Sequence, residues 1–414
     1  MTGRLAPASA PYAPWASGLH SIGVTGTNGK TSTTLFVAEV LRAAGLAVAS
    51  ETTIGVGARL GEYDSPSQST FFDRMRGHAD AGVTHLALEV TSEALASGWA
   101  KRWRFDAGVF TNLSHDHLNA HGSFEHYLAS KAQLFVHLPS GAVAVFNSAD
   151  PVSGWLERVT PADVRRLYFA AASRGPAMRA ADLAARLTHV GPLGTTAELE
   201  PSELSEALDR KLEIELLGEV FLENALAAAL VAWGHGIEPQ TIQRGLRSVS
   251  KIPGRFEVIA RAPWVVVDYA HTPDALARTL ATGRALLADT SGAKLIVVFG
   301  AGGDRDANKR EAMGVAVGRR ADVAILTNDN PRREDPARIA EALARGCAQA
   351  GCARVVIELD RARAIDRALN SAGSRDLVLI CGKGHERTQT ERGITRHFDD
   401  AALVRAWLGM TSSA

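Results

Sequence analysis

The sequence predicts an α/β protein in which strands and helices alternate in two successive blocks, each built on a mostly parallel sheet. Three observations support this fold class. A strand-like run near the N-terminus leads through a glycine-rich loop into an apolar-periodic helix. Strand-like and helical segments then alternate along most of the chain. The pair Pro253-Gly254 interrupts this alternation, so we expect an arm at residues 1–20 and two domains, at 21–250 and 251–414.

In the first block, apolar runs separated by glycine and polar turns predict the positions of the elements. The expected strands lie at residues 21–25, 46–50, 85–90, 107–111 and 142–146. The expected helices lie at residues 32–44, 71–81, 124–138, 222–233 and 239–248. The segment 162–215 is less periodic, and we expect smaller strands there.

The second block contains further strand-like runs, separated by helical stretches, at residues 264–269, 294–299, 323–327, 354–358 and 377–381. Sheets of this kind bind ligands at the carboxyl ends of their strands. The segments richest in polar and charged residues follow these runs, at 268–271, 300–305, 329–332 and 382–386. We therefore expect a binding site where these loops meet.

Composition narrows the function before any motif is considered. The 414 residues are 46% hydrophobic, and Lys+Arg and Asp+Glu are both 45, so no global basic field favours nucleic acid or acidic membranes as partners. Three cysteines are too few for a disulfide framework in a chain of this length. No apolar run approaches eighteen residues, and residues 1–20 have no continuous apolar stretch. We expect a cytoplasmic enzyme acting on small molecules.

The loop Gly26-Thr27-Asn28-Gly29-Lys30-Thr31, followed by Ser32, has the residues of a phosphate-binding turn. Backbone N–H groups can surround phosphate oxygens, the lysine can reach the terminal phosphates of ATP, and the threonine hydroxyl can bind Mg²⁺. The spacing is shorter than the common G-x-x-x-x-G-K-[ST] form, whose first glycine would fall at Val24. Taken alone, the loop favours ATP binding no more than an ordinary strand-to-helix turn.

Two further segments carry candidate metal ligands. Glu89 ends a buried apolar run, where a carboxylate is costly unless it meets a cation or hydrogen-bond donors. Magnesium held by Thr31 and Glu89 would satisfy that requirement, whereas the alternative is a solvated carboxylate at a strand end. His117 belongs to a segment after the next strand, 112–118, that places two histidines and an acid at three consecutive positions, and Lys131 lies on an expected helix. By themselves, these two are more typical of a structural histidine and a solvated lysine.

The order of the motifs resembles the Mur ligase family, in particular its tripeptide-synthetase (MurE-like) branch, over residues 21 to 410. The matching segments are 26–31, 89–92, 112–118, Lys131, 254–257, 268–274, 302–306, 329–332 and 382–386. The resemblance implies a central P-loop ATPase domain and a Rossmann-like C-terminal domain that binds the amino substrate. It also implies an ATP-dependent amide ligase that activates a carboxylate as an acyl phosphate, which an amine then attacks.

The resemblance also implies roles for individual residues. Gly26 to Ser32 would hold the phosphates of ATP, with Thr31 and Glu89 on a first Mg²⁺. His117 and a carbamylated Lys131 would serve a second metal, because a carbamate offers anionic oxygens where a free ammonium would repel the ion. The remaining cofactor contacts would be Asn224 to adenine, Arg255 to the γ-phosphate and Asp268 to the ribose, with His271 as a further cofactor-binding residue.

The loop Asp329-Asn330-Pro331-Arg332 resembles the signature of family members that add meso-diaminopimelate. A guanidinium can bind a carboxylate through two hydrogen bonds, and a glutamate can receive an ammonium. A surface arginine on a proline-containing turn is the alternative for Arg332. The matching substrate-binding positions are Arg305, Asp329, Asn330, Arg332, Gly382 and Glu386.

Several departures from the family pattern concern the acceptor. Family members carry a nucleotide-sugar domain before the ATP loop, whereas only residues 1–20 precede the first strand here. Asp64-Ser65-Pro66 replaces a Thr-Thr-Pro element, Glu93 replaces a histidine, and Val220-Phe221 replaces a Phe-Asn pair. We therefore expect an acceptor smaller than the UDP-linked muramoyl dipeptide.

Two other functions stay open. A partner chain could supply acceptor binding to a murein tripeptide synthetase. A nucleotide-dependent regulatory protein that has lost ligation is the other alternative. His117 and Lys131 weigh against the second alternative, because ATP binding alone needs no second metal site.

Overall fold

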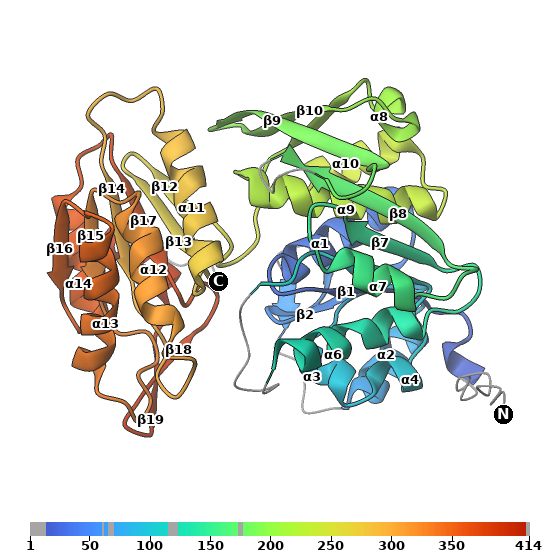
Figure 1. Cartoon of the computed structure of the whole chain (residues 1–414), viewed down its shortest axis with the longest axis horizontal. Coiled ribbons are helices and arrows are strands. Elements are labelled where there is room, and N and C mark those ends of the chain that lie inside the picture. Colours follow the sequence, from blue (N-terminus) through green and yellow to red (C-terminus); the bar gives the residue numbers. More distant parts are fainter. Residues whose placement is uncertain (1–13, 60–61, 65–69, 115–122, 173–176, 411–414) are drawn as a thin grey trace. The chain divides into compact units, whose positions relative to one another are not determined.

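A computed structural model describes residues 14–59, 62–64, 70–114, 123–172 and 177–410. The side chains of 57–59 and 62–64 are outside this description. The chain divides into two compact units. The first unit comprises Met1–His189 and Gly194–Ser250, and the second comprises Val190–Leu193 and Lys251–Ala414. Each unit is built on its own sheet with helices on both faces, which confirms the predicted α/β fold class (Figure 1).

The described residues of the first unit form an 11-stranded sheet in the order β11-β10-β9-β8-β7-β6-β1-β5-β2-β3-β4. Its strands are β1 His20–Thr25, β2 Val48–Thr52, β3 Gly55–Arg59, β4 Glu62–Asp64, β5 His85–Glu89, β6 Ala107–Phe110, β7 Val143–Asn147, β8 Arg165–Ala171, β9 Leu183–Gly191, β10 Gly194–Leu199 and β11 Lys211–Ile214. Within the stretch β9-β8-β7-β6-β1-β5-β2 of this order, each strand pairs in parallel with the next. The irregular segment after residue 162 forms the outer strands.

The register of β1 determines which side chains meet beyond the sheet. Val24 pairs with Glu89 of β5 on one side and with Val109 of β6 on the other. Because the three strands are parallel, their carboxyl ends lie side by side at one edge. The glycine-rich loop, Glu89 and the residues after β6 are therefore brought together by backbone pairing alone.

Helices cover both faces of the first sheet (Figure 1). On one face, Leu134 and Phe135 of α6 pack in an apolar core with alternate residues of β5, β6 and β7. On the other face, α1 packs against α9 and α10. The helices are α1 Lys30–Ala43, α2 Phe71–Asp80, α3 Ser92–Ala96, α4 Trp99–Arg102, α6 Phe124–Val136, α7 Ser153–Val159, α8 Glu203–Ala207, α9 Glu219–Gly234 and α10 Pro239–Arg247.

The second unit is built on a six-stranded sheet in the order β12-β13-β17-β14-β15-β16. Its strands are β12 Glu257–Arg261, β13 Trp264–Asp268, β14 Leu295–Phe299, β15 Val323–Leu326, β16 Arg354–Ile357 and β17 Leu377–Cys381, and a separate hairpin consists of β18 Thr388–Glu391 and β19 Ile394–His397. The helices are α11 Pro273–Leu286, α12 Lys309–Gly318, α13 Pro336–Gln349, α14 Arg361–Ser371 and α15 Asp400–Trp407. One apolar core joins α14 and α15 to alternate residues of the parallel strands. Across the described residues of both units, no helix combines the length and the apolar character needed to cross a lipid bilayer.

Three groups of strands differ from the sequence-based expectation. Strand β12 is an antiparallel edge strand, and the pairs β3–β4 and β18–β19 are short hairpins. The thirteen positions of β12, β18 and β19 include three partly buried apolar side chains, Val258, Ile259 and Ala260, so no apolar run longer than three residues marks these strands. Helix α9 begins earlier than expected, after Gly218, whose φ of 108° ends the preceding extended segment. Cross-strand pairing rather than local composition determines the strands β3, β4, β12, β18 and β19.

Gly245 of α10 allows a close contact between α10 and α1. A Cβ atom there would lie 2.4 Å from the Cα atom of Val40 in α1. We expect Gly245→Ala to lower the free energy of unfolding by about 1–3 kcal/mol, because the backbone of one helix must move away. Urea titration measures this change. Gly77→Ala on α2 is the control, since a Cβ there meets nothing within 4 Å; a comparable loss in both variants would contradict the packing argument.

Candidate active site

The glycine-rich loop connects β1 to α1 and is held by the residues that follow β6. The Asn28 N–H donates to Oδ1 of Asn112 at 3.0 Å, and Nδ2 of Asn112 donates back to the Asn28 carbonyl at 2.9 Å. The Thr27 N–H donates to the Asn112 carbonyl at 2.8 Å. The Thr111 hydroxyl also donates to the Asn28 carbonyl, at 2.6 Å. Asn112 therefore fixes the shape of the loop before any ligand binds.

Both glycines of the loop are required by close contacts. At Gly26, a Cβ atom would lie 1.9 Å from the Thr111 hydroxyl oxygen. At Gly29, where φ is 85°, a Cβ atom would lie 2.3 Å from Oδ1 of Asn224. Helix α1 starts immediately afterwards at Lys30, so its first N–H groups and the positive end of its dipole face the loop. This arrangement is suited to phosphate.

Thr31 and Glu89 lie together at the start of α1. The Thr31 hydroxyl donates to Oε2 of Glu89 at 2.8 Å, and the Thr53 backbone N–H donates to the same oxygen at 3.0 Å. Nζ of Lys30 lies 3.9 Å from Oε1 and donates to the Thr27 carbonyl at 3.0 Å. The Glu89 side chain is 3% exposed, and these donors satisfy its charge. The hydroxyl and the carboxylate are both oxygen ligands of the kind that Mg²⁺ prefers.

Lys131 is buried beside the same loop. Its Nζ donates to the Gly26 carbonyl at 2.7 Å and lies 4.4 Å from the centroid of the Tyr127 ring. The Tyr127 hydroxyl is 3.1 Å from the Thr27 hydroxyl. His117 lies outside the described residues. Within the described ranges, no three His, Cys, Asp or Glu side chains converge as a metal site.

The residues of the first unit fit a nucleoside triphosphate. Nδ2 of Asn224 is buried and has no hydrogen-bond partner among the described residues. A buried amide N–H₂ without a partner is costly, so this group is suited to an acceptor on a ligand. The loop, the start of α1 and Lys30 provide complementary donors for phosphate oxygens. Asn224 lies against Gly29 of the loop itself, and its predicted contact with adenine stays a prediction.

In the second unit, loops from two strands meet over the end of a third. Strands β15 and β17 flank β14. Gly300 follows β14, and a Cβ atom there would lie 2.2 Å from the Thr327 carbonyl oxygen, so the chain leaving β15 passes directly over this glycine. A Cβ atom at Gly382, where φ is 115°, would lie 2.7 Å from Oδ2 of Asp329. Both glycines are needed for the loops to approach.

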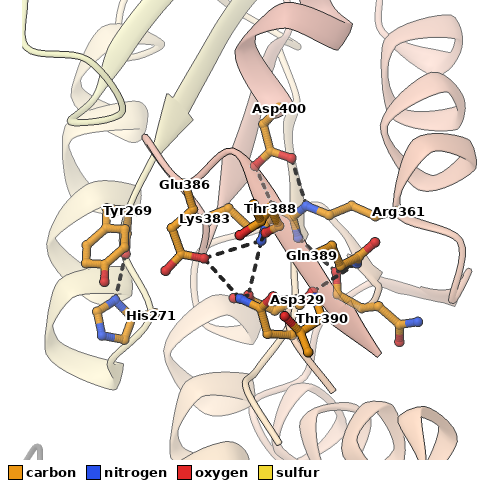
Figure 2. A network of polar contacts seen from close by, with 12 residues as sticks. Tyr269, His271, Asp329, Arg361, Lys383, Glu386, Thr388, Gln389, Thr390 and Asp400 are labelled. Atoms are coloured by element: carbon orange, nitrogen blue, oxygen red, sulfur yellow. Dashed lines mark hydrogen bonds and ion pairs between the residues drawn. The ribbon is translucent and has the colours of Figure 1, made fainter. Parts of the chain in front are cut away.

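A polar network occupies this meeting point (Figure 2). Nδ2 of Asn330 donates to Oδ1 of Asp329 at 3.1 Å and to Oε2 of Glu386 at 3.0 Å. The Thr390 N–H donates to Oδ1 of Asn330 at 2.9 Å, which fixes the orientation of the amide. Three of the predicted substrate residues, Asp329, Asn330 and Glu386, are thus in one network, and Gly382 lies against Asp329.

The two predicted arginines border the same glycine. A Cβ atom at Gly302 would lie 3.1 Å from Nη1 of Arg332 and 3.5 Å from Cγ of Arg305. Arg332 has a left-handed backbone, with φ of 53°, and its Nη1 donates to the Gly303 carbonyl at 2.7 Å. Arg305 is exposed. The Arg332 guanidinium and the side-chain stem of Arg305 therefore both approach Gly302.

Glu334 holds the loop that carries Arg305. Its oxygens accept hydrogen bonds of 2.8 Å from Nη1 and Nη2 of Arg310 and of 2.6 Å from the Asp304 N–H. The Arg310 hydrogen bonds lower the pKa of the Glu334 carboxyl, against the opposing effect of burial and with the help of the Asp304 amide. A lowered pKa means that this stabilisation is present above the ordinary pKa and is lost as pH falls through the lowered value.

The remaining predicted cofactor residues lie in the second unit near β13. The Arg255 guanidinium lies 4.1 Å from the centroid of the Tyr269 ring, and the His271 ring packs against the edge of the same tyrosine. Asp268 accepts hydrogen bonds from the Phe256 N–H at 2.6 Å, the Ala270 N–H at 2.9 Å and the Thr279 hydroxyl at 3.0 Å. Both of its oxygens thus stabilise local turns, and its contact with ribose stays a prediction.

The sequence alone does not single out several residues that shape the two sites. The sequence marks Asn112 only as part of a motif, although its place soon after a strand is a usable signal. Arg361 is fully buried, pairs with Asp400 at 2.7 Å, and donates to the Cys381 carbonyl at 3.1 Å (Figure 2). No local pattern distinguishes this arginine from a solvated one. The other such residues are Thr53, Tyr127 and Lys383.

Asn112→Ala tests the role of this asparagine in shaping the loop. The substitution removes the Asn112 amide from the Asn28 N–H and from the Asn28 carbonyl, which keeps only the Thr111 hydroxyl of these two donors, so we expect the affinity for ATP to fall roughly tenfold or more. Isothermal titration calorimetry measures the affinity. Gln133→Ala is the control, because that amide bonds only to the Ala129 carbonyl one turn earlier on α6. Unchanged ATP affinity in the Asn112 variant would show that the loop keeps its shape without this residue.

Comparisons with known proteins agree with these two units. Residues 24–232 match the Mur ligase middle domain, and residues 254–384 match the glutamate ligase domain of Mur ligases. The chain is 37% identical over 410 residues to the UDP-N-acetylmuramoyl-L-alanyl-D-glutamate–2,6-diaminopimelate ligase of Aquifex aeolicus, covering 94% of this chain and 78% of that protein. It is 38% identical over 399 residues to the ligase of the same name from Chlorobaculum tepidum, covering 94% and 76%.

Solved structures give the same result. A structure of a UDP-N-acetylmuramoyl-L-alanyl-D-glutamate–2,6-diaminopimelate ligase is similar with a TM-score of 0.63 at 33% identity, covering 94% of this chain and 78% of that one. Folylpolyglutamate synthase of Mycobacterium tuberculosis is similar in fold, with a TM-score of 0.70 at 20% identity, covering 96% and 92%. The chain belongs to the Mur ligase family of ATP-dependent ligases that form amide bonds.

Proposed function

We propose that this ligase joins an acceptor carboxylate to an amino group of diaminopimelate or a close analogue. The observation that carries the proposal is that Asn330 contacts both a held carboxylate, Glu386, through its amide and the Arg332 guanidinium through its carbonyl, on a loop beside the stem of Arg305. Diaminopimelate has two carboxylates and two amines. An ion pair with Glu386 would hold one amine as an ammonium, the arginines would bind a carboxylate, and the other amine would be left to react. Relatives at 37–38% identity are named for 2,6-diaminopimelate.

The first unit would bind ATP and Mg²⁺. Lys30, Gly26 to Ser32 and the N–H groups of α1 would hold the phosphates, and Thr31 and Glu89 would hold the metal. ATP supplies the phosphoryl group that turns the acceptor carboxylate into an acyl phosphate, with release of ADP. The amine then attacks the carbonyl carbon, an amide bond forms, and phosphate and a proton leave. Asn224, Arg255, Asp268 and His271 would complete the nucleotide contacts.

Lys131 would act as a carbamate. As an ammonium it donates to the Gly26 carbonyl, and its charge would oppose a metal ion close to the loop. Reaction of the neutral amine with CO₂ would form a carbamate and release a proton, which would replace the positive charge with one negative charge shared by two oxygens, suited to a second Mg²⁺. The carbamate and His117 would then hold this metal, which would supply positive charge to the reacting groups.

The acceptor is the least constrained substrate. The named relatives act on UDP-N-acetylmuramoyl-L-alanyl-D-glutamate. The departure at Glu93, at the start of α3, supports an acceptor other than that nucleotide-linked peptide. Free L-alanyl-D-glutamate is the simplest candidate, since it keeps the carboxylate to be activated and lacks the nucleotide.

Phosphate release from ATP, with mass spectrometry of the product, tests the amino substrate. We expect release to need both an acid and an amine, and kcat/KM for diaminopimelate to exceed that for lysine about tenfold or more. Lysine has both amines but lacks the second carboxylate, so it loses the ion pair with the arginines. Equal use of lysine, or no use of diaminopimelate, would contradict the assignment of residues 329–332.

The same assay distinguishes the acceptors. Each amine is supplied with free L-alanyl-D-glutamate and, separately, with the UDP-linked peptide, and reactions without any acid serve as the control. Tight binding and efficient turnover of the UDP-linked peptide would refute the proposal of a smaller acceptor, while leaving the amino substrate unaffected.

Lys131→Ala tests the carbamate. We expect turnover to fall by about 10²–10³, the effect of losing a group that stabilises developing charge, while the affinity for ATP changes little. Lys101→Ala, at an exposed lysine of α4, is the control. Phosphate release measures turnover, and calorimetry measures ATP affinity. The proposal requires turnover to fall while ATP affinity is kept. A regulatory protein would show no change in either quantity.

A further inference from the structure

Lys383 is a fully buried lysine beneath the loops that would bind the amino substrate. Its side chain is 0% exposed, and neither the motifs nor the resemblance assigns it a role. Nζ donates to the Thr388 carbonyl at 2.5 Å and to Oε2 of Glu386 at 3.3 Å, and lies 4.0 Å from Oδ1 of Asp329 (Figure 2). An ammonium in such a position is costly unless it is paired. The two carboxylates provide this pairing.

The charges around Lys383 do not balance. One ammonium faces two carboxylates, so one negative charge is left uncompensated within this cluster. The Asp329 side chain is 8% exposed, whereas the Glu386 side chain is 35% exposed. A buried anion needs its counter-ion more than a half-exposed one does. The uncompensated negative charge therefore lies on Glu386, the more exposed of the two carboxylates.

The two oxygens of Glu386 differ. Oε2 accepts from Nδ2 of Asn330 at 3.0 Å and from Nζ of Lys383 at 3.3 Å. Among the described residues, Oε1 accepts no hydrogen bond, and Figure 2 shows the dashed contacts of Glu386 at one oxygen only. A carboxylate with one oxygen held by two donors has lost most of its rotational freedom. A cationic ligand at the other oxygen then binds with less ordering cost.

We propose that Lys383 is a positioning residue: it holds Oε2 of Glu386 and thereby directs Oε1 to the ammonium of the amino substrate. The inference rests on the proposed function, in which Glu386 receives that group. It makes Lys383 a determinant of specificity for amino acids with a second amine. The competing explanation is structural, since the bond to the Thr388 carbonyl ties the loop after β17 to β18.

The two explanations differ in the substrate whose binding they affect. A purely structural role would weaken every amino substrate, because the whole loop would loosen. A positioning role acts only on the amine that Glu386 holds. 2-Aminopimelate separates them, since it keeps both carboxylates and the reacting amine and lacks only the second amine.

The experiment measures kcat and KM for diaminopimelate and 2-aminopimelate with the wild type, Lys383→Met, Glu386→Gln and the double variant. For Lys383→Met we expect KM for diaminopimelate to rise about tenfold or more, the effect of losing a charge-assisted hydrogen bond, with kcat less affected. KM for 2-aminopimelate stays near the wild-type value. The double variant matches Glu386→Gln, because Lys383 acts through that carboxylate.

Two further variants control the experiment. Lys294→Met removes an exposed lysine at the opposite edge of the same sheet and should leave both substrates unaffected. Lys383→Gln keeps an N–H donor and is used if Lys383→Met does not fold, as judged by thermal unfolding. We expect it to show the same selective loss, at smaller size.

Each outcome decides the inference. Equal losses for both substrates, or no loss for either, would overturn the positioning role while the ligase activity stands. If the wild type does not use diaminopimelate but ligates another diamino acid, the proposed substrate is wrong, and the same comparison is made with that acid and its mono-amino analogue. If only mono-amino acids react, Glu386 has no ammonium to hold and the inference fails too.

Discussion

Both sites depend on one constraint, the alignment of the carboxyl ends of parallel strands along one edge of a sheet. In the first unit, β1 lies between β5 and β6, so the glycine-rich loop, Glu89 and Asn112 follow neighbouring strands. In the second unit, β17 and β15 flank β14, so Gly382 and Asp329 are brought together. Backbone pairing thus gathers residues that are far apart in sequence, and side-chain contacts only refine their positions.

Buried charges hold the loops of the second unit in that arrangement. Arg361 pairs with Asp400 and donates to the carbonyls of Asn328 and Cys381, the residues just before the two site loops. Lys383 lies between the carboxylates of those loops. Removing one partner of a buried ion pair leaves an uncompensated charge, which costs several kcal/mol. The loops are therefore fixed by charges that an apolar core could not place as specifically.

The sequence predicts the elements of this protein that depend on residues close together in the chain. Continuous apolar runs identify the central strands, and the loop from Gly26 to Thr31 and the acid Glu89 identify the phosphate end, because a strand followed by polar residues is a local pattern. Strand β12 and the β18–β19 hairpin have no such run. Lys383 and Arg361 have ordinary local sequences and become informative only through partners up to 54 and 39 positions away. Long-range pairing of buried charges is what sequence inspection cannot resolve.

Two asparagines show how differently the sites are prepared for ligands. The Asn330 amide is fully engaged, with Nδ2 on Asp329 and Glu386 and Oδ1 on the Thr390 N–H. The Asn224 amide is buried with Nδ2 unpartnered among the described residues. The first is part of a frame that is complete without a ligand, and the second has a donor left for one. The proposed site for the amino substrate is therefore preorganised by side chains. The proposed phosphate site relies instead on backbone N–H groups and on a buried donor, for which the nucleotide would supply the acceptor.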